Sequence, residues 1–228
     1  MNLLTFQNAK TIKGESLGWR TAILYLAPHK ISGTNLCEGA SPGCIASCLF
    51  TAGRGAMNYV QNARLNKTNY FNKDPKAFVE QLCGEIKREE KSAKKQGLNL
   101  CVRLNGTSDI RWENHGIIQQ FPHIQFYDYT KIHERVLNNK LANYHLTFSL
   151  HEKNQDKALE VLKAGYNVAA VFDNVLPEQY LGYPVTNGDE HDLRFTDISP
   201  CIVGLKAKGR ARYDEIGFKL TTKEITNV

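Results

Sequence analysis

The chain has 228 residues, 42% hydrophobic and 23% charged, and its 29 Lys and Arg against 23 Asp and Glu give a formal net charge of +6. This composition is typical of a soluble globular protein, and no segment approaches the ~18 consecutive apolar residues that a membrane span requires. At this length roughly 70% of the unfolded surface is buried, so we expect a single domain over residues 1–228.

The N-terminal residues MNLLTFQNAKTIKGES have neither a basic start, nor an apolar core, nor a small-residue cleavage site. They therefore do not resemble a signal peptide, and we expect a cytoplasmic protein without a membrane partner. In a reducing compartment, clustered cysteines more often bind metal or carry out redox chemistry than form disulfides.

The first third of the chain predicts a strand, a loop and two helices. Residues 19–26, WRTAILYL, are β-branched and aromatic enough for a buried strand. A loop rich in Gly, Ser and Pro follows over residues 29–47, and apolar spacing favours a helix over about 57–71. Asp74 and Pro75 then indicate the start of a second helix that ends near Gly97. Its apolar stripe includes Cys83, which we interpret as a core residue.

Four later segments each alternate an apolar with a polar face: LNLCVRLNG, HIQFYDYTK, NYHLTFSLHE and NVAAVFD. Helix-compatible segments at residues 132–141 and 155–163 lie between them, which favours βαβ crossovers and a parallel sheet. Because one face of these strands is polar, we expect helices outside and a polar interior. The predicted fold is α/β, a full or partial parallel (β/α) barrel.

In such barrels the active-site residues lie at the carboxyl ends of the strands. Polar side chains at these ends make candidate ligand- or substrate-binding residues, although loops are polar in any case. The candidates for cofactor binding are Asn105, Lys131, Ser149, His151 and Asp173, and Asp109 and Glu152 stand at the same ends.

Residues 183–228 form a turn-rich, basic C-terminal segment that is strand-like at 201–205. Lys206, Lys208, Arg210 and Arg212 follow at a spacing of two, so an extended backbone would place them on one basic edge. Together with Arg54, Arg64 and Lys67 they could contact an anionic partner such as nucleic acid. A solvated surface explains the same residues.

The main candidate site is the cysteine loop, residues 36–55, which contains Cys37, Cys44 and Cys48 in a Cx6Cx3C pattern. Zinc sites usually have paired C-x2-4-C knuckles, whereas three loop thiolates suit a [4Fe-4S] cluster. Zinc and unmetallated thiols remain alternatives. Cys201 is the first candidate for a fourth metal ligand and Cys101 the second; otherwise the fourth iron is open to a small molecule.

Several motifs together resemble the gene-product-88 family of bacteriophage proteins. They are the cysteine loop with its AGRG sequence, the FYDYTK strand, and NGDEHDLRFTD followed by IVGLKAKGRAR. The resemblance implies a phage protein in the host cytoplasm during infection. The layout also resembles radical S-adenosylmethionine enzymes, whose three-cysteine loop follows the first barrel strand, although their usual spacing is CxxxCxxC.

These observations give a leading hypothesis and two alternatives. The leading one is an iron–sulfur protein with one [4Fe-4S] cluster, acting in electron transfer or as a radical enzyme that binds S-adenosylmethionine. Its partner is then an electron donor or a small-molecule ligand. The first alternative is a nucleic-acid-binding or replication protein with a structural metal site, and the second is a virion-associated or assembly scaffold.

Overall fold

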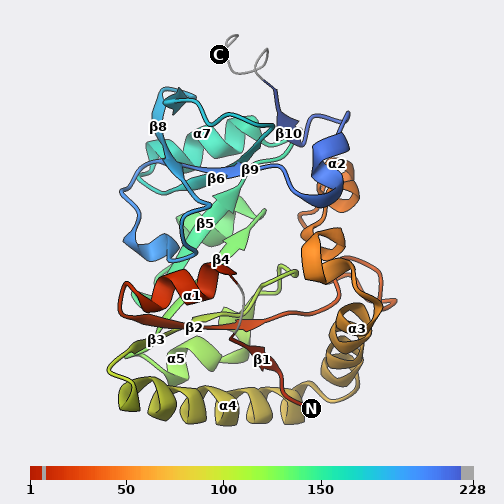
Figure 1. Cartoon of the computed structure of the whole chain (residues 1–228), viewed down its shortest axis with the longest axis vertical. Coiled ribbons are helices and arrows are strands. Elements are labelled where there is room, and N and C mark those ends of the chain that lie inside the picture. The colour runs from red at the N-terminus through yellow and green to blue at the C-terminus, as the bar shows by residue number, and fades with distance from the viewer. Residues whose placement is uncertain (7–8, 222–228) are drawn as a thin grey trace.

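A ten-stranded, mostly parallel sheet organises the protein, whose computed structural model describes residues 1–6 and 9–221 (Figure 1). Neighbouring strands follow the order β1-β2-β3-β4-β5-β6-β9-β8-β7, and β10 pairs with β6. The strands are β1 (Leu4–Thr5), β2 (Trp19–Leu24), β3 (Asn99–Arg103), β4 (Gln125–Thr130), β5 (Tyr144–Ser149), β6 (Val168–Phe172), β7 (Gln179–Tyr180), β8 (Tyr183–Asn187), β9 (Ile202–Lys206) and β10 (Lys219–Leu220).

The sheet is open, so of the full or partial barrel that the sequence predicts, the full barrel is not formed. Strands β2 to β6, β9 and β8 pair in parallel, but the free edge of β2 is taken by antiparallel β1 and that of β8 by antiparallel β7. Closure would require β2 and β8 to reach one another, and both of their outer edges are already occupied. The α/β class and the parallel core of the prediction are confirmed.

The helices begin and end largely where the sequence predicts. Asp74 caps α4, accepting a hydrogen bond from the backbone N–H of Ala77 at 3.0 Å, and Gly97 follows its end with φ of 70°. Only α6 is much shorter than its predicted segment. The α-helices are α1 (Ala9–Glu15), α2 (Pro42–Ala46), α3 (Asn58–Lys73), α4 (Pro75–Lys95), α5 (Ile117–Gln120), α6 (His133–Leu137) and α7 (Gln155–Lys163).

Short 3-10 helices lie between the α-helices and strands. They are η1 (Leu49–Thr51), η2 (Gly53–Ala56), η3 (Trp112–His115), η4 (Arg194–Thr196) and η5 (Gly209–Tyr213). Because β9 ends at Lys206 and η5 begins at Gly209, the basic run is not extended. The extended backbone that one basic edge would require is therefore absent from this segment, because the chain turns at Gly209, which has φ of 55°.

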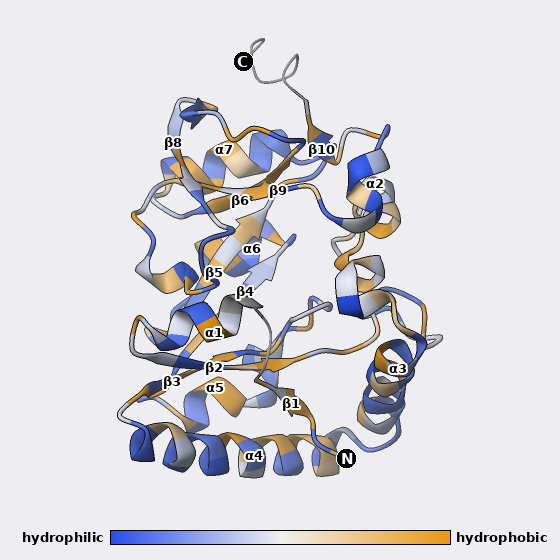
Figure 2. Ribbon diagram, viewed as in Figure 1, coloured by the Kyte–Doolittle hydropathy of each residue, from blue (hydrophilic) through white to orange (hydrophobic). Residues whose placement is uncertain are grey.

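One face of the sheet, the helix face, carries the main hydrophobic core. Leu100, Val102, Phe126 and Phe148 point to it and pack with apolar residues of α4, α5 and α7. In Figure 2 strands β6 and β9 are coloured as hydrophobic, whereas much of α4 is coloured as hydrophilic. Cys83 belongs to this core, as predicted.

The opposite face, here the polar face, carries the alternate residues of the same strands. Cys101 and Tyr127 pack there with Leu193, and Ala169 packs with Cys201 and Val203. Helix α1 lies against β2, and η4 against β5. The residues of β3 and β4 thus alternate between the two faces as predicted, although the second face also carries small hydrophobic clusters. No helix among the described residues is long and apolar enough to cross a membrane.

Candidate metal centre at the carboxyl edge of the sheet

A cavity lies where the parallel strands reach their carboxyl ends. Its empty volume is about 1140 Å³, part of it open to solvent. Residues at or after the ends of β2, β3, β4, β5, β6 and β9 contribute to the lining, among them Pro28, Asn105, Lys131, Ser149, Val171 and Lys206. This is the edge at which open α/β sheets generally bind ligands.

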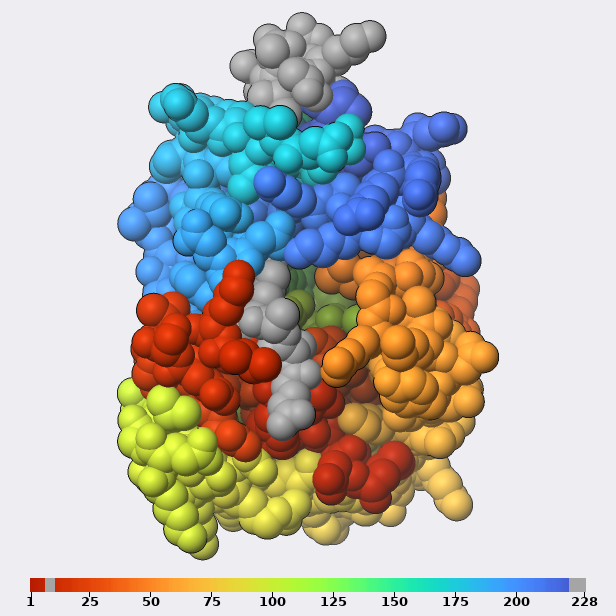
Figure 3. Space-filling model, in the orientation of Figure 1, coloured from red at the N-terminus to blue at the C-terminus, as the bar shows by residue number. Residues whose placement is uncertain are grey.

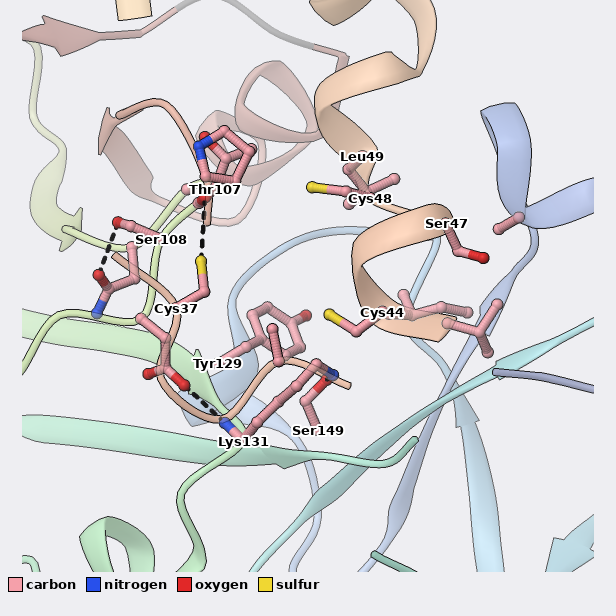
Figure 4. A pocket seen from close by; sticks show the side chains of 18 of the residues that line it. Cys37, Cys44, Ser47, Cys48, Leu49, Thr107, Ser108, Tyr129, Lys131 and Ser149 are labelled. Atoms are coloured by element: carbon pink, nitrogen blue, oxygen red, sulfur yellow. Dashed lines mark hydrogen bonds between the residues drawn. The ribbon is translucent and has the colours of Figure 1, made fainter. Parts of the chain in front are cut away.

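The three loop cysteines all line this cavity. Figure 4 shows the Sγ atoms of Cys37, Cys44 and Cys48 around a common space above Tyr129 and Lys131. All three thiols are free and partly exposed, whereas Cys83, Cys101 and Cys201 are buried and do not line the cavity. The structure therefore separates the six cysteines into three that face the cavity and three that do not.

Hydrogen bonds within the loop fix Cys37. The backbone N–H of His29 donates to its Sγ at 3.3 Å, and its own N–H donates to Asn35 Oδ1 at 3.1 Å. The neighbouring carbonyl of Leu36 accepts from the N–H of Asp109 at 2.8 Å. These bonds join the cysteine loop to the segment that follows β3.

Cys44 lies in α2, whose start is held by Glu152 from the loop after β5. Ser41 Oγ donates to Glu152 Oε2 at 2.7 Å, and the N–H of Gly43 donates to Oε1 at 3.0 Å. Ser41 in turn accepts from the N–H of Cys44 at 3.1 Å. A Cβ at Gly43 would lie 2.7 Å from Glu152 Oε2 and 2.9 Å from the Cβ of Phe218, so a larger residue would force both neighbours to move.

Cys48 precedes η1 and lies near the guanidinium of Arg64, a buried residue of α3. That guanidinium stacks at 4.8 Å over the ring of Tyr25 and at 5.4 Å over that of Phe50, and its Nε has no hydrogen-bond partner. The expectation that Arg64 and Lys67 contact an anionic partner is wrong, because both are buried and Lys67 donates to the carbonyl of Leu3.

Burial raises the pKa of all three loop thiols, that of Cys37 to about 12, and repulsion from Cys48 and Cys44 adds to the shift at Cys37. Lys131 opposes the shift at Cys44, since its ammonium stabilises a thiolate. Without a bound metal the thiols are therefore protonated at neutral pH. Among the described residues, no three His, Cys, Asp or Glu side chains are grouped around one point so as to hold a single metal ion.

Three of the five predicted cofactor-binding residues line the cavity: Asn105, Lys131 and Ser149. Lys131 Nζ donates to Ser149 Oγ at 2.9 Å and lies 5.2 Å from the centre of the Phe218 ring. The side chain of Asn105 is already occupied, because its Oδ1 accepts from Ser108, Ile110 and Trp112 and its Nδ2 donates to Ile110 and Asp128. Asn105 thus shapes the loop after β3.

The other predicted residues lie outside the cavity lining. Nδ1 of His151 accepts from the N–H of Lys153 at 3.2 Å, and Asp173 lies 3.4 Å from Lys219 Nζ with its side chain 40% exposed. Cys201 comes just before β9, at the amino end of the strand whose carboxyl end reaches the cavity, and Cys101 lies within β3 beside Thr21. The two candidates for a fourth cysteine ligand are therefore not brought to the loop.

Sequence reasoning missed an ion pair at the base of the cavity. Arg103 NH1 donates to Asp192 Oδ2 at 2.8 Å, and its guanidinium lies 4.6 Å from the centre of the Tyr129 ring. The alternating sequence pattern places Arg103 and Tyr129 on the polar faces of their strands. Asp192, however, lies in the turn-rich segment before η4, and no local pattern in that segment signals its position.

Comparison with known proteins identifies the family. No curated protein and no solved structure matches the chain. The family model described as Gene product 88 matches residues 2–219, almost the full sequence, and confirms the resemblance carried by the cysteine loop and the IVGLKAKGRAR segment. The chain belongs to the Gene product 88 family.

Proposed function

We propose that the protein binds one [4Fe-4S] cluster through Cys37, Cys44 and Cys48, with the fourth iron facing the cavity. The observation that carries this proposal is that these three thiols, and no other cysteine among the described residues, line one cavity at the carboxyl edge of the sheet. Three cysteine ligands leave one iron of a cubane for a different ligand.

The chemistry of the donors fits such a cluster. Thiolates are soft ligands that favour iron–sulfur clusters, zinc and Cu(I) over hard cations. In a cubane each cysteine binds a different iron, so the three thiols need not surround a single point. A tetrahedral zinc site would need its donors around one ion, at about 2.3 Å from it.

Two cations adjoin these thiols and would offset the negative charge of a bound cluster. Lys131 stabilises a thiolate at Cys44, and Arg64 does so at Cys48. Nearby positive charge and hydrogen bonds to the sulfurs are known means of setting a cluster's reduction potential. The protein therefore supplies both ligands and charge compensation from three separate segments: the cysteine loop, α3 and the end of β4.

The proposed activity is redox chemistry on a small molecule held in the cavity, and radical chemistry with S-adenosylmethionine is its sharper form. When bound, such a cluster supplies one electron to its ligand. Supporting the sharper form, the cysteine loop follows β2, the first of the parallel strands in the sheet. Lys131, with its ammonium at the cavity wall, would pair with an anionic group of the ligand.

Metal analysis tests the proposal. Protein purified without oxygen should contain about four irons and four sulfides per chain. Cys37→Ala, Cys44→Ala and Cys48→Ala should each lose most of the iron, whereas the matched control Cys83→Ala should retain it, because Cys83 lies in the core away from the cavity. Equal losses in all four variants would show that stability, not ligation, had been measured.

Spectroscopy separates the forms of the proposal. With dithionite added, a change in the EPR spectrum on addition of S-adenosylmethionine would support the radical enzyme, and an unchanged spectrum would support electron transfer. Zinc in place of iron would reject the cluster and favour the alternative of a structural metal site in a nucleic-acid-binding protein.

A further inference from the structure

Exposed basic and aromatic side chains lie on two segments that flank the cavity, the end of β9 with η5 and the end of the cysteine loop. Lys206 lines the cavity at the end of β9, and Arg210, Arg212 and Tyr213 belong to η5, which follows it. Arg54, in η2, lies just after the cysteine loop's third cysteine. We call these five residues the basic rim, and all five are exposed.

The fold brings the two halves of the basic rim together. Segment η5 contacts η1, and a Cβ placed at Gly209 would lie 2.9 Å from the Cβ of Ala52. Figure 3 shows the deep blue C-terminal segment directly against the orange segment of the cysteine loop, with a hollow beside them. Residues about 150 positions apart in the sequence thus share one edge of the cavity.

The charges of the basic rim are largely uncompensated. Within the described residues, no ion pair involves Arg54, Lys206, Arg210 or Arg212, and the nearby Lys208 is paired with Asp189 at 2.5 Å. Asp214, which accepts hydrogen bonds from the N–H groups of Gly217 and Lys219, and the exposed Glu215 are acids next to the rim. Their two negative charges do not balance the positive charges of Arg54, Lys206, Arg210 and Arg212, so the local charge stays positive.

An exposed aromatic ring stands among these cations. Tyr213 is 84% exposed, directly after Arg212, and a second tyrosine, Tyr59, is 68% exposed one residue into α3 after η2. Cations alone would suit any polyanion, but exposed rings beside a cationic path are the arrangement that binds unpaired bases by stacking. The bases of a duplex are stacked on one another, which leaves fewer base faces for such rings.

We propose that the basic rim binds single-stranded nucleic acid, with phosphates at Arg54, Lys206, Arg210 and Arg212 and a base stacked on Tyr213. The strand would cross the cavity opening. Because none of the rim residues is a proposed metal ligand, this surface does not depend on the cluster, and it goes beyond the redox activity proposed above.

Fluorescence anisotropy with a labelled 20-nucleotide single strand, in a salt series, tests the proposal. The triple variant Lys206→Gln, Arg210→Gln, Arg212→Gln should bind at least about tenfold more weakly, and its log affinity should fall less steeply with log salt, by about 2 in slope. Tyr213→Ser should weaken binding about five- to a hundredfold without changing that slope.

A matched control carries the same charge change elsewhere. Lys87→Gln, Lys91→Gln, Lys95→Gln alters three exposed lysines of α4, and this variant should bind like the unmodified protein. If the α4 triple variant bound the strand as weakly as the rim triple variant, net charge would explain the effect and the proposal would be overturned. A rim triple variant with normal strand affinity would overturn it as well. Tighter binding of the matched duplex than of the single strand would also overturn it.

The iron content separates this test from that of the cluster. The rim variants should retain the metal content of the unmodified protein, and Cys44→Ala should retain the affinity for the single strand. Loss of strand binding in Cys44→Ala, measured well below the temperature at which that variant unfolds, would contradict a rim that acts independently of the metal site.

Discussion

His145 is a histidine held neutral by its position on the polar face of β5. Its Nε2 is buried without a hydrogen-bond partner, and the fully buried Arg194 lies close enough to repel a proton. Burial, reinforced by Arg194, lowers the pKa of His145 to about 4. The unfolded chain would bind a proton at this side chain near pH 6.5.

This difference makes the protein less stable in mild acid. Because the folded pKa is lowered, protons favour the unfolded state, so stability is intact above pH ~6.5 and falls as the pH drops toward 4. We expect a loss of about 1–2 kcal/mol between pH 7 and pH 5 from this residue, allowing for its partial exposure. Urea unfolding of His145→Gln at both pH values should show a correspondingly smaller loss.

The control for that measurement is His123→Gln, at a histidine whose side chain is 57% exposed. Other titrating groups act equally in the variant and the unmodified protein, so they cancel in the comparison. An identical pH dependence for His145→Gln and the unmodified protein would show that His145 is not held neutral in the fold.

At the scale of elements, α2 is too short to be stable alone and depends on its neighbours. It spans Pro42–Ala46, and isolated helices shorter than ~12 residues are marginal in water. At the start of α2, the carboxylate of Glu152 accepts hydrogen bonds from Ser41 and Gly43. Burial opposes the ionisation of Glu152, but the hydrogen bonds from Gly43 and Ser41 outweigh this effect and lower its pKa.

Glu152→Ala should therefore loosen α2 specifically. Losing two hydrogen bonds to a charged group costs on the order of 1–3 kcal/mol, and the loss should appear as faster hydrogen exchange at the amides of Gly43 and Cys44 and as lower iron retention. Glu80→Ala, at an exposed position of α4, serves as the control. Unchanged exchange at these amides would mean that α2 is held by other contacts.

The elements could be predicted well where a local pattern decides them. Asp74-Pro75 and Gly97 bound α4, and the alternation in LNLCVRLNG places Leu100 on the helix face and Arg103 in the cavity. The turn at Gly209 could not be predicted from a basic run with a spacing of two. Spacing gives the faces of a strand only if the backbone is extended, which is a property of the local dihedral angles.

On the scale of the molecule, the cavity is assembled from strand ends that are distant in sequence. Its location at the carboxyl edge follows from parallel strands, which the sequence pattern indicates. Whether the sheet closes depends on the short strands β1 and β7. Each has only two residues, too few to show the alternating pattern by which a strand is predicted. Likewise, the direction of β9 decides that Cys201 lies at the opposite end from the loop cysteines.

Because the cavity sits at one edge, the core should survive loss of the metal. Of residues 36–55, only Leu36 belongs to the main hydrophobic cluster, which otherwise joins the sheet to α4, α5 and α7. We expect the metal-free protein to keep its far-UV circular dichroism and to unfold cooperatively. Its Tm should fall by about 5–15 °C, since a ligand bound only by the folded state contributes a few kcal/mol.

Anaerobic chelation followed by thermal unfolding and hydrogen exchange measures this effect. Faster exchange should be confined to the cysteine loop and to its contacts in η5 and the loop after β3, because these segments hold the cavity walls and little of the core. A metal-free protein that loses its secondary structure would instead resemble small zinc domains, in which metal binding supplies the folding free energy. In that case the metal would be structural, and the cavity beside it would not be the reactive site proposed here.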